Sequence, residues 1–153
     1  MSEDTSDATP TMRRMQPPVT PVTEPFWEAT RDSRYLVQWC VDCDEAIFYP
    51  REICPGCLGT DLEWRDASGD ATVYAVTVEH RPQDKANADF APYVVALVDL
   101  AEGVRVLTNV IGCEPDDVSV GMPVRITWEA LEDGRQLPQF EPADLPTPKG
   151  NDT

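Results

Sequence analysis

Cys40-Val41-Asp42-Cys43, followed after ten residues by Cys54-Pro55-Gly56-Cys57, is a metal-binding pattern. Each Cys-x-x-Cys pair can direct two sulfur atoms at one ion from a single tight turn, and Pro55 and Gly56 supply turn-forming residues. Two such turns at the ends of a hairpin complete a tetrahedral set of four thiolates, which suits zinc. The pattern therefore predicts one zinc ion bound by Cys40, Cys43, Cys54 and Cys57.

The coordination number of this site predicts its role. Four protein thiolates close the zinc shell and leave no position for water or substrate, so we expect a structural zinc and no Lewis-acid catalysis there. Two other uses of the cysteines fit the pattern less well. A redox Cys-x-x-Cys site needs a single pair, normally at a helix start, and an iron site of the rubredoxin kind usually separates its pairs more widely.

The charge of the chain limits its partners. Its 153 residues include 28 acidic and 12 basic side chains, a net charge of −16. Phosphate backbones and anionic membranes would repel such a surface, so we expect neither nucleic acid nor membrane as a partner. The N-terminus lacks the basic start and apolar core of a secretory signal, and no apolar run reaches the roughly 18 residues of a membrane helix. We therefore expect a cytoplasmic protein, in which thiols stay reduced.

The two ends of the chain have compositions that disfavour packed structure. Five prolines interrupt the first 25 residues, with Ser, Thr and Asp between them, and prolines return from Pro138 onward. We therefore expect disordered segments at 1–24 and 143–153. Pro25 suits the first turn of a short helix, which we expect to lead into a zinc ribbon within 25–66.

Residues 67–142 contain a series of strand-like segments. Their bounds are 71–79, 93–98, 104–111, 124–131 and 136–140. The turn at 101–103 predicts a hairpin between the second and third segments. Short strands with little helix between them predict a small closed or partly closed barrel, since closure removes exposed sheet edges. We expect a mainly β protein with a five-stranded barrel of the oligonucleotide/oligosaccharide-binding (OB) type.

The alternation of side chains assigns faces to three of these segments. Tyr74, Val76 and Val78 share one side of the first segment. Segment 93–98 is apolar on both faces, which suits a buried central strand. In the fourth segment, the even-numbered residues from Val124 to Ala130 are expected to face inward and the residues between them outward.

Little else in the sequence indicates catalysis. Cys113 is expected to be a small buried apolar side chain. His80 is the only histidine, and no serine or cysteine nucleophile stands beside it in the sequence. A catalytic triad is therefore not supported.

Six further motifs accompany the cysteine pairs. They are Phe26-Trp27-Glu28, Phe48-Tyr49-Pro50-Arg51, Leu62-Glu63-Trp64, Ser68-Gly69, Pro92-Tyr93-Val94-Val95-Ala96 and Gly121-Met122-Pro123-Val124. With them the chain resembles, over residues 25–142, a family that joins a rubredoxin-like zinc ribbon to an OB-fold and is known as domain of unknown function thirty-five. Asp44 departs from the family pattern, because the first cysteine turn often carries glycine there. The ligand set is unaffected.

The resemblance implies a function that composition does not. Proteins of this family look like non-catalytic partners of thiolase-superfamily enzymes, including acyl-CoA thiolases, complexes of hydroxymethylglutaryl-CoA synthase, and aldolases that shorten steroid side chains. It implies an accessory subunit that holds an acyl-CoA beside the active site of a thiolase-like enzyme. Some relatives are fused to hydratase-type domains. Without such a fusion, the enzyme is expected to be a separate polypeptide in a hetero-oligomer.

Four aromatic residues are candidates for docking on that partner. They are Phe26, Trp27, Phe48 and Tyr49. Large aromatic side chains often dominate protein interfaces. Phe26 and Trp27 can also pack against the chain's own ribbon or barrel, and both uses stay open at this point.

Three basic residues are candidates for contacts with CoA phosphates or with the partner. They are Arg51, Arg81 and Lys85. Ordinary solvated surface is the alternative for each of them. Zinc ribbons and OB-folds also commonly bind nucleic acids, so an OB-fold nucleic-acid-binding module is the alternative function. The acidic charge argues against it, and no basic stripe interleaved with aromatic residues is present.

Overall fold

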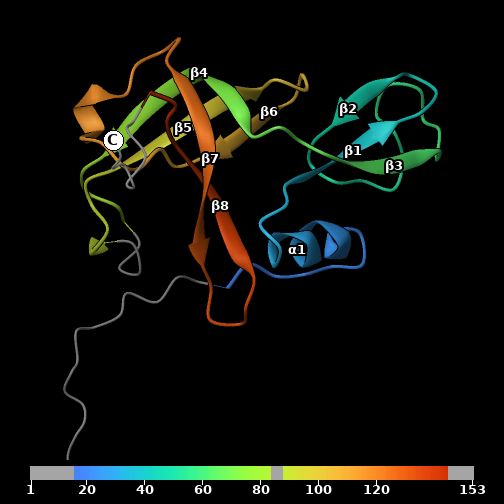
Figure 1. The fold of residues 1–153 in the computed structure, drawn as a ribbon, viewed down its shortest axis with the longest axis horizontal. Coiled ribbons are helices and arrows are strands. Elements are labelled where there is room, and N and C mark those ends of the chain that lie inside the picture. Colours follow the sequence, from blue (N-terminus) through green and yellow to red (C-terminus); the bar gives the residue numbers. More distant parts are fainter. Residues whose placement is uncertain (1–15, 84–87, 145–153) are drawn as a thin grey trace, which may run out of the picture.

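The computed structural model describes residues 16–83 and 88–144, which form two adjoining β units with a short helix beside them (Figure 1). The elements in chain order are α1 (Glu24–Thr30), β1 (Leu36–Cys40), β2 (Glu45–Ile47), β3 (Leu62–Asp66), β4 (Asp70–Glu79), β5 (Tyr93–Leu100), β6 (Arg105–Thr108), the 3-10 turn η2 (Pro115–Asp117), β7 (Pro123–Ala130) and β8 (Gln136–Pro142). The predicted mainly β fold with one short leading helix is confirmed for the described residues.

The first sheet, the ribbon, has the strand order β2-β1-β3, and both outer strands run antiparallel to β1. Its own apolar core is small. Cys40, Ile47 and Cys54 are buried there, with Cys43 and Leu62 packed against them. A unit that buries so little apolar surface depends on metal ligation for its stability.

The second sheet, the barrel, has the order β6-β5-β4-β7-β8 with antiparallel neighbours throughout. The sheet curls until Val110, beyond the end of β6, forms a parallel bridge with Phe140 of β8. There the Phe140 N–H donates to the Asn109 carbonyl at 3.0 Å, and the Ile111 N–H donates to the Phe140 carbonyl at 2.8 Å. The predicted five-stranded barrel is therefore confirmed in a partly closed form. Its hairpin between β5 and β6 also has the predicted pairing.

Strand β5, the predicted buried central strand, pairs with β6 and β4 and is apolar on both faces but buried on only one. Val94, Ala96 and Val98 are at most 2% exposed, whereas Val95 and Leu97 on the outer face are half-buried. The prediction that both faces are buried is wrong for this strand. The sheet curls around a single core and leaves its outer face toward solvent, as antiparallel sheets commonly do.

A β-bulge in β4 changes the predicted faces of that strand. The pairing of β4 with β5 shifts register between Val73 and Ala75. Val73 is buried before the bulge, and Val76 and Val78 pack against the core after it, but Tyr74 is 49% exposed. The prediction that Tyr74 shares their side is wrong, because one extra residue in a strand reverses its alternation.

The predicted inner face of β7 is correct for most of its length. Val124 is buried, and Ile126 and Trp128 pack against the same core. Ala130 is exposed, contrary to prediction, because it is the last residue of β7 and adjoins the turn into β8.

Residues 16–24 form the entry to α1. Thr20 and Thr23 accept each other's backbone N–H at 2.9 and 3.2 Å, and the Pro17 carbonyl accepts a hydrogen bond from Arg135. This part of the predicted disordered segment therefore has defined contacts. At the start of the predicted disordered tail, the Ala143 N–H donates to the Pro123 carbonyl at 3.0 Å. Residues 1–15 and 145–153 lie outside the described residues. Among those that are described, no helix has the length and apolar character needed to cross a bilayer.

Candidate functional site

The four ribbon cysteines converge on one point. Their sulfur atoms all lie within 4.8 Å of one another, with Cys40 and Cys57 at 3.7 Å and Cys43 and Cys54 at 3.8 Å. A tetrahedron of sulfurs about 2.3 Å from a zinc ion has edges of about 3.8 Å. The donor set and its size therefore fit zinc, and the prediction of a structural zinc site is confirmed.

The two cysteine turns, or knuckles, have the same backbone geometry. The residue after each pair, Asp44 or Leu58, donates its N–H at 2.8 Å to the carbonyl of the first cysteine of that pair. Asp44 has a φ of 58° and Leu58 a φ of 63°. This left-handed residue reverses the chain so that both sulfurs of a pair point to the same side.

Electrostatics explain why the cysteines require a cation. Backbone N–H groups of Cys57 and then Gly56 lower the pKa of Cys54 to about 7. The neighbouring thiols, that of Cys57 first, raise the pKa of Cys43 to about 12. Four thiolates this close repel one another, so their joint deprotonation depends on the charge of a bound metal ion.

Two glycines lie beside the cysteine sulfurs, and one of them has no room for a side chain without a shift. A Cβ atom on Gly56 would lie 3.7 Å from the sulfurs of both Cys43 and Cys54. A Cβ atom on Gly59 would lie 3.2 Å from the Cys57 sulfur. A side chain at Gly59 would therefore crowd the Cys57 ligand, whereas the distance at Gly56 is an ordinary van der Waals contact.

The predicted aromatic residues meet at the junction of α1, the ribbon and the barrel. Phe26 is 6% exposed, and its ring lies edge-on to Trp27 at 5.0 Å and to Tyr35 at 5.3 Å. Tyr35 in turn lies 6.4 Å from Trp128 of β7, and burial raises the pKa of the Tyr35 hydroxyl. Phe26 therefore packs inside the chain, and the surface at this junction comes from its neighbours.

An apolar groove of about 220 Å³ opens beside this cluster, and we name it the junction groove. Its rim includes Trp27 from α1, Tyr49 and Pro50 from the ribbon, Leu107 from β6 and Pro138 from β8. Tyr49 and Leu107 are 57% and 58% exposed. All four predicted aromatic residues thus line the groove, with Phe26 buried at its base and Tyr49 exposed.

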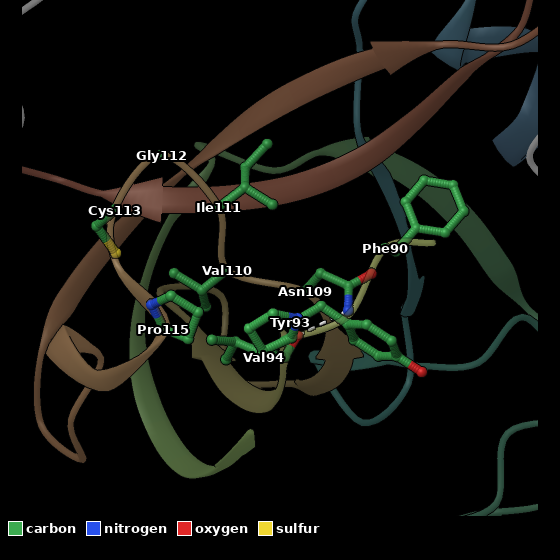
Figure 2. A pocket seen from close by; sticks show the side chains of 10 residues that line it. Phe90, Tyr93, Val94, Asn109, Val110, Ile111, Gly112, Cys113 and Pro115 are labelled. Atoms are coloured by element: carbon green, nitrogen blue, oxygen red, sulfur yellow. Dashed lines mark hydrogen bonds between the residues drawn. The ribbon is translucent and has the colours of Figure 1, made fainter. Parts of the chain in front are cut away.

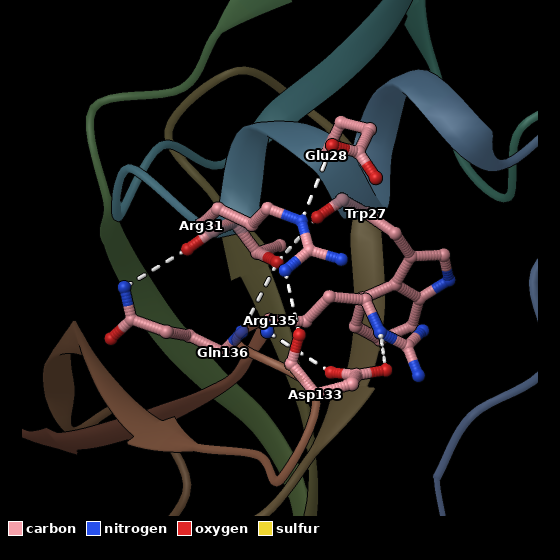
Figure 3. Close-up of polar contacts among 7 residues, drawn as sticks. Trp27, Glu28, Arg31, Asp133, Arg135 and Gln136 are labelled. Atoms are coloured by element: carbon pink, nitrogen blue, oxygen red, sulfur yellow. Dashed lines mark hydrogen bonds and ion pairs between the residues drawn. The ribbon is translucent and has the colours of Figure 1, made fainter.

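A polar network fixes α1 against the turn between β7 and β8 (Figure 3). Arg31 donates to the Asp133 carbonyl at 2.7 Å, and the Gln136 side chain donates to the Thr30 carbonyl at 2.9 Å. The nearly buried Arg135 pairs with the Asp133 carboxylate at 2.7 Å and lies 5.0 Å over the Trp27 ring. These contacts hold the walls of the junction groove together.

The backbone of Arg51, which follows the groove residue Pro50, is held by a residue that sequence reasoning missed. The buried Gln38 amide donates to the Arg51 carbonyl at 2.7 Å and accepts from the Arg51 N–H at 2.6 Å. The Arg51 side chain remains exposed. A polar residue at an inward position of β1 was the one available signal for this clamp.

The other two predicted basic residues do not join Arg51. Arg81 is exposed in the segment after β4, which lies at the end of the barrel away from the ribbon (Figure 1). Its backbone N–H donates to the Glu79 carboxylate at 3.3 Å. Lys85 lies outside the described residues.

A second pocket, which the sequence did not predict, lies at this other end of the barrel (Figure 2). It has a volume of about 420 Å³, and its walls include Phe90, Tyr93 and Cys113. Asn109 donates its side-chain amide across the pocket floor to the Val94 carbonyl at 2.7 Å. Cys113 is half-buried, and burial raises its pKa. The lining residues come from separate strands and loops, so no local sequence motif predicts the pocket.

The fold and the metal centre together define a class of protein in which a rubredoxin-like zinc ribbon precedes an OB-fold. Comparison with family models supports both parts. Residues 27–63 match the rubredoxin-like zinc ribbon domain of ChsH2, and residues 64–129 match the C-terminal OB-fold domain of ChsH2.

Similarity to individual proteins identifies the family to which the chain belongs. The chain is 39% identical over 98 residues to a DUF35 domain-containing scaffold protein of Methanocaldococcus jannaschii, covering 62% of this chain and 68% of that protein. It is 40% identical over 119 residues, or 77% of its length, to a probable enoyl-CoA hydratase alpha subunit of Thermomonospora curvata, but spans only 37% of that protein. The chain belongs to the DUF35 family of zinc-ribbon and OB-fold proteins.

A solved structure supports the same assignment. A chain of the Ltp2-ChsH2(DUF35) aldolase is 36% identical and superimposes with a TM-score of 0.75. The match covers 84% of this chain and 99% of the other. The similarity therefore extends over nearly the whole of that chain.

Proposed function

We propose that this protein is a non-catalytic accessory subunit that docks on a separate thiolase-like enzyme and helps to hold its acyl-CoA substrate. One observation carries the proposal: the chain matches 99% of a chain from a complex named Ltp2-ChsH2(DUF35) aldolase, at 36% identity. That name joins a DUF35 protein to a second protein. The names of scaffold protein and alpha subunit among the other relatives are consistent with a subunit role.

The chemistry of the metal centre supports a non-catalytic role. Among residues 16–83 and 88–144, the four cysteines form the one group of three or more side chains that could together hold a metal ion. All four thiolates are needed to complete a tetrahedral zinc shell, so the ion has no position for a substrate. Bond making and breaking are therefore assigned to the partner enzyme.

The junction groove is the proposed docking surface for that enzyme. Tyr49 and Leu107 present exposed apolar area on either side of it, and Trp27 contributes a half-buried indole. The network around Arg135 and the Gln38 clamp hold these residues in place before any partner arrives. Rigid aromatic and arginine side chains around an apolar depression are the residues that most often dominate interface energies.

Arg51 is the proposed contact for a phosphate of the acyl-CoA. It follows Pro50, which lines the groove, so a cation stands beside an apolar surface. A CoA thioester has the matching pair of features, an anionic nucleotide end and a long uncharged arm. Arg81 and Lys85 remain proposed contacts for a second phosphate or for the partner.

Co-expression with thiolase-like proteins from the same genome tests the proposal. This chain and one of those proteins are expected to co-purify, to catalyse condensation or retro-aldol cleavage of a CoA ester together, and to show no turnover when this chain is alone. Tyr49→Ala is expected to weaken association at least tenfold, and Tyr74→Ala, which removes a similarly exposed ring from the barrel, is expected to leave it unchanged. A chain that binds no thiolase-like protein, or that turns over CoA esters alone, contradicts the proposal.

A further inference from the structure

Left-handed backbone at residues other than glycine marks three places in the described chain. Ser33, Asp44 and Leu58 have φ angles of 59°, 58° and 63°. This conformation is unfavourable for residues with a Cβ atom, and Asn and Asp tolerate it better than most. A stable chain therefore needs a compensating interaction, or a functional reason, at each of them.

Two of the three have compensating hydrogen bonds. The Ser33 hydroxyl accepts from the Gln136 side chain at 2.7 Å. The Asp44 carboxylate accepts from the Trp39 indole N–H at 3.1 Å. The side chains of Ser33 and Asp44 thus each form a hydrogen bond with another side chain of the same protein.

Leu58 differs from both. Its side chain cannot form a hydrogen bond, and it is 74% exposed, the highest value among the large apolar side chains of the described residues. Its position matches that of Asp44 in the other knuckle, where an N–H donates to the first cysteine carbonyl. Asparagine or glycine would relieve the backbone strain and remove apolar surface from water. Neither the backbone nor burial within the chain accounts for leucine at this position.

A second exposed apolar side chain lies on the same turn as Leu58. Ile53, which is 49% exposed, precedes Cys54, and the Cys54 N–H donates to the Gly59 carbonyl at 2.9 Å. Ile53 and Leu58 therefore flank the same turn, and we name this pair the knuckle tip. The Asp42 carboxylate lies 3.4 Å from the position of a Cβ on Gly59.

The ribbon that carries the knuckle tip has a net negative charge. Seven acidic and two basic residues lie between residues 36 and 66. A zinc ion with four thiolates adds two further negative charges. A second copy of this chain, with its own net charge of −16, would be repelled by this surface. A surface with basic side chains around an apolar depression would be attracted to it.

We propose that the knuckle tip inserts into an apolar pocket bordered by arginine or lysine side chains on the partner enzyme, at a contact separate from the junction groove. This inference rests on the proposed function and specifies a second point of attachment for the same partner. The ribbon then contributes affinity through a side chain that costs the isolated chain stability.

Replacing Leu58 separates stability from association. Leu58→Asn relieves the strain and removes the apolar contact, whereas Leu58→Met keeps both. The zinc-loaded variants are titrated with the thiolase-like protein that co-purifies with the wild type. Leu58→Asn is expected to weaken association at least tenfold while raising the melting temperature of the free chain by about 2–4 °C. Leu58→Met is expected to match the wild type in both measurements.

Two further measurements test the chemistry of the contact. Val120→Asn removes a barrel side chain that is 66% exposed, and it is expected to leave association unchanged. Raising the salt from about 0.1 to about 0.5 M is expected to weaken association of the wild type, because opposite charges are screened.

The outcomes distinguish this inference from the proposed function. If the wild type binds the thiolase-like protein and Leu58→Asn binds it equally well, the knuckle tip is not a contact. If Leu58→Asn lowers the melting temperature or loses zinc, the leucine is structural and the inference fails. If Val120→Asn weakens association as much, or salt strengthens association, the stated chemistry is wrong. If the wild type binds no thiolase-like protein, the proposed function and this inference fail together.

Discussion

The ribbon and the barrel lie next to each other in Figure 1 but are stabilised in different ways. The ribbon buries Cys40, Ile47 and Cys54 in its own small cluster, so metal ligation supplies most of its stability. The barrel has a contiguous core that includes Val98, Val124 and Phe140, each at most 1% exposed, and that extends to the leading helix and to Val37 of β1. One chain thus combines a unit that depends on an ion with a unit that depends on the hydrophobic effect.

Removing the zinc is expected to have the largest effect on stability and to test whether the ribbon unfolds without the barrel. Cys40→Ser, or a strong chelator, is expected to unfold β1–β3, since structural zinc contributes about 10–16 kcal/mol in small zinc domains. Amide hydrogen exchange should show lost protection in the ribbon and retained protection in β4–β8. Cys113→Ser, which alters a cysteine outside the metal centre, is the control. Simultaneous loss of protection in both units would show that they are not independent.

A cavity in the barrel core is expected to have the opposite effect: it destabilises the barrel and leaves the zinc site of the ribbon intact. Phe140→Ala removes a ring that is 1% exposed and is expected to destabilise the barrel by about 3–5 kcal/mol. Urea unfolding measures the loss, and zinc content per chain should remain at one ion. Release of zinc from the folded variant would contradict the separate stabilisation of the ribbon.

The connection between the two units gives a smaller effect. Gly69 has a φ of +93°, and a Cβ atom there would lie 2.7 Å from the Ile126 side chain. Gly69→Ala is therefore expected to destabilise the chain by about 1–3 kcal/mol. Gly103 has a φ of +101° with no atom within 4 Å of its Cβ position, so Gly103→Ala carries the strain without the clash. Thermal melts of both should rank Gly69→Ala as the more damaging, and equal losses would rule out the clash.

The smallest expected effect comes from the exposed ion pair of Arg34 and Asp66, at 2.9 Å beside the end of β3. The hydrogen bond from Arg34 lowers the pKa of Asp66 below its usual range, so the pair contributes stability at neutral pH and loses it as the pH falls through that pKa. Because the pair is exposed, Asp66→Asn is expected to lower the melting temperature by about 1 °C or less at pH 7. In about 1 M salt the difference should disappear. A larger or salt-independent loss would assign Asp66 another role.

The metal centre was predictable from sequence, and the junction was not, for a physical reason. The four cysteines lie within 18 residues, and their spacing directly encodes two tight turns. The strands were also predictable, because alternation and turn residues are local signals. The β-bulge at Tyr74 escaped prediction, since it inserts one residue without altering composition. Both uses of Phe26 stayed open from sequence, and only its packing against Tyr35 in the structure shows that its ring is buried.

The polar contacts between α1 and the turn after β7 have a consequence for binding entropy. Thr30 and Gln136 lie 106 positions apart in the sequence, yet their hydrogen bond fixes α1, and with it the ribbon side of the groove, against the barrel. Two surfaces that could otherwise rotate independently are held at one separation before the partner arrives. An enzyme that contacts both would lose little free energy in ordering them, so even modest contacts could support a durable complex.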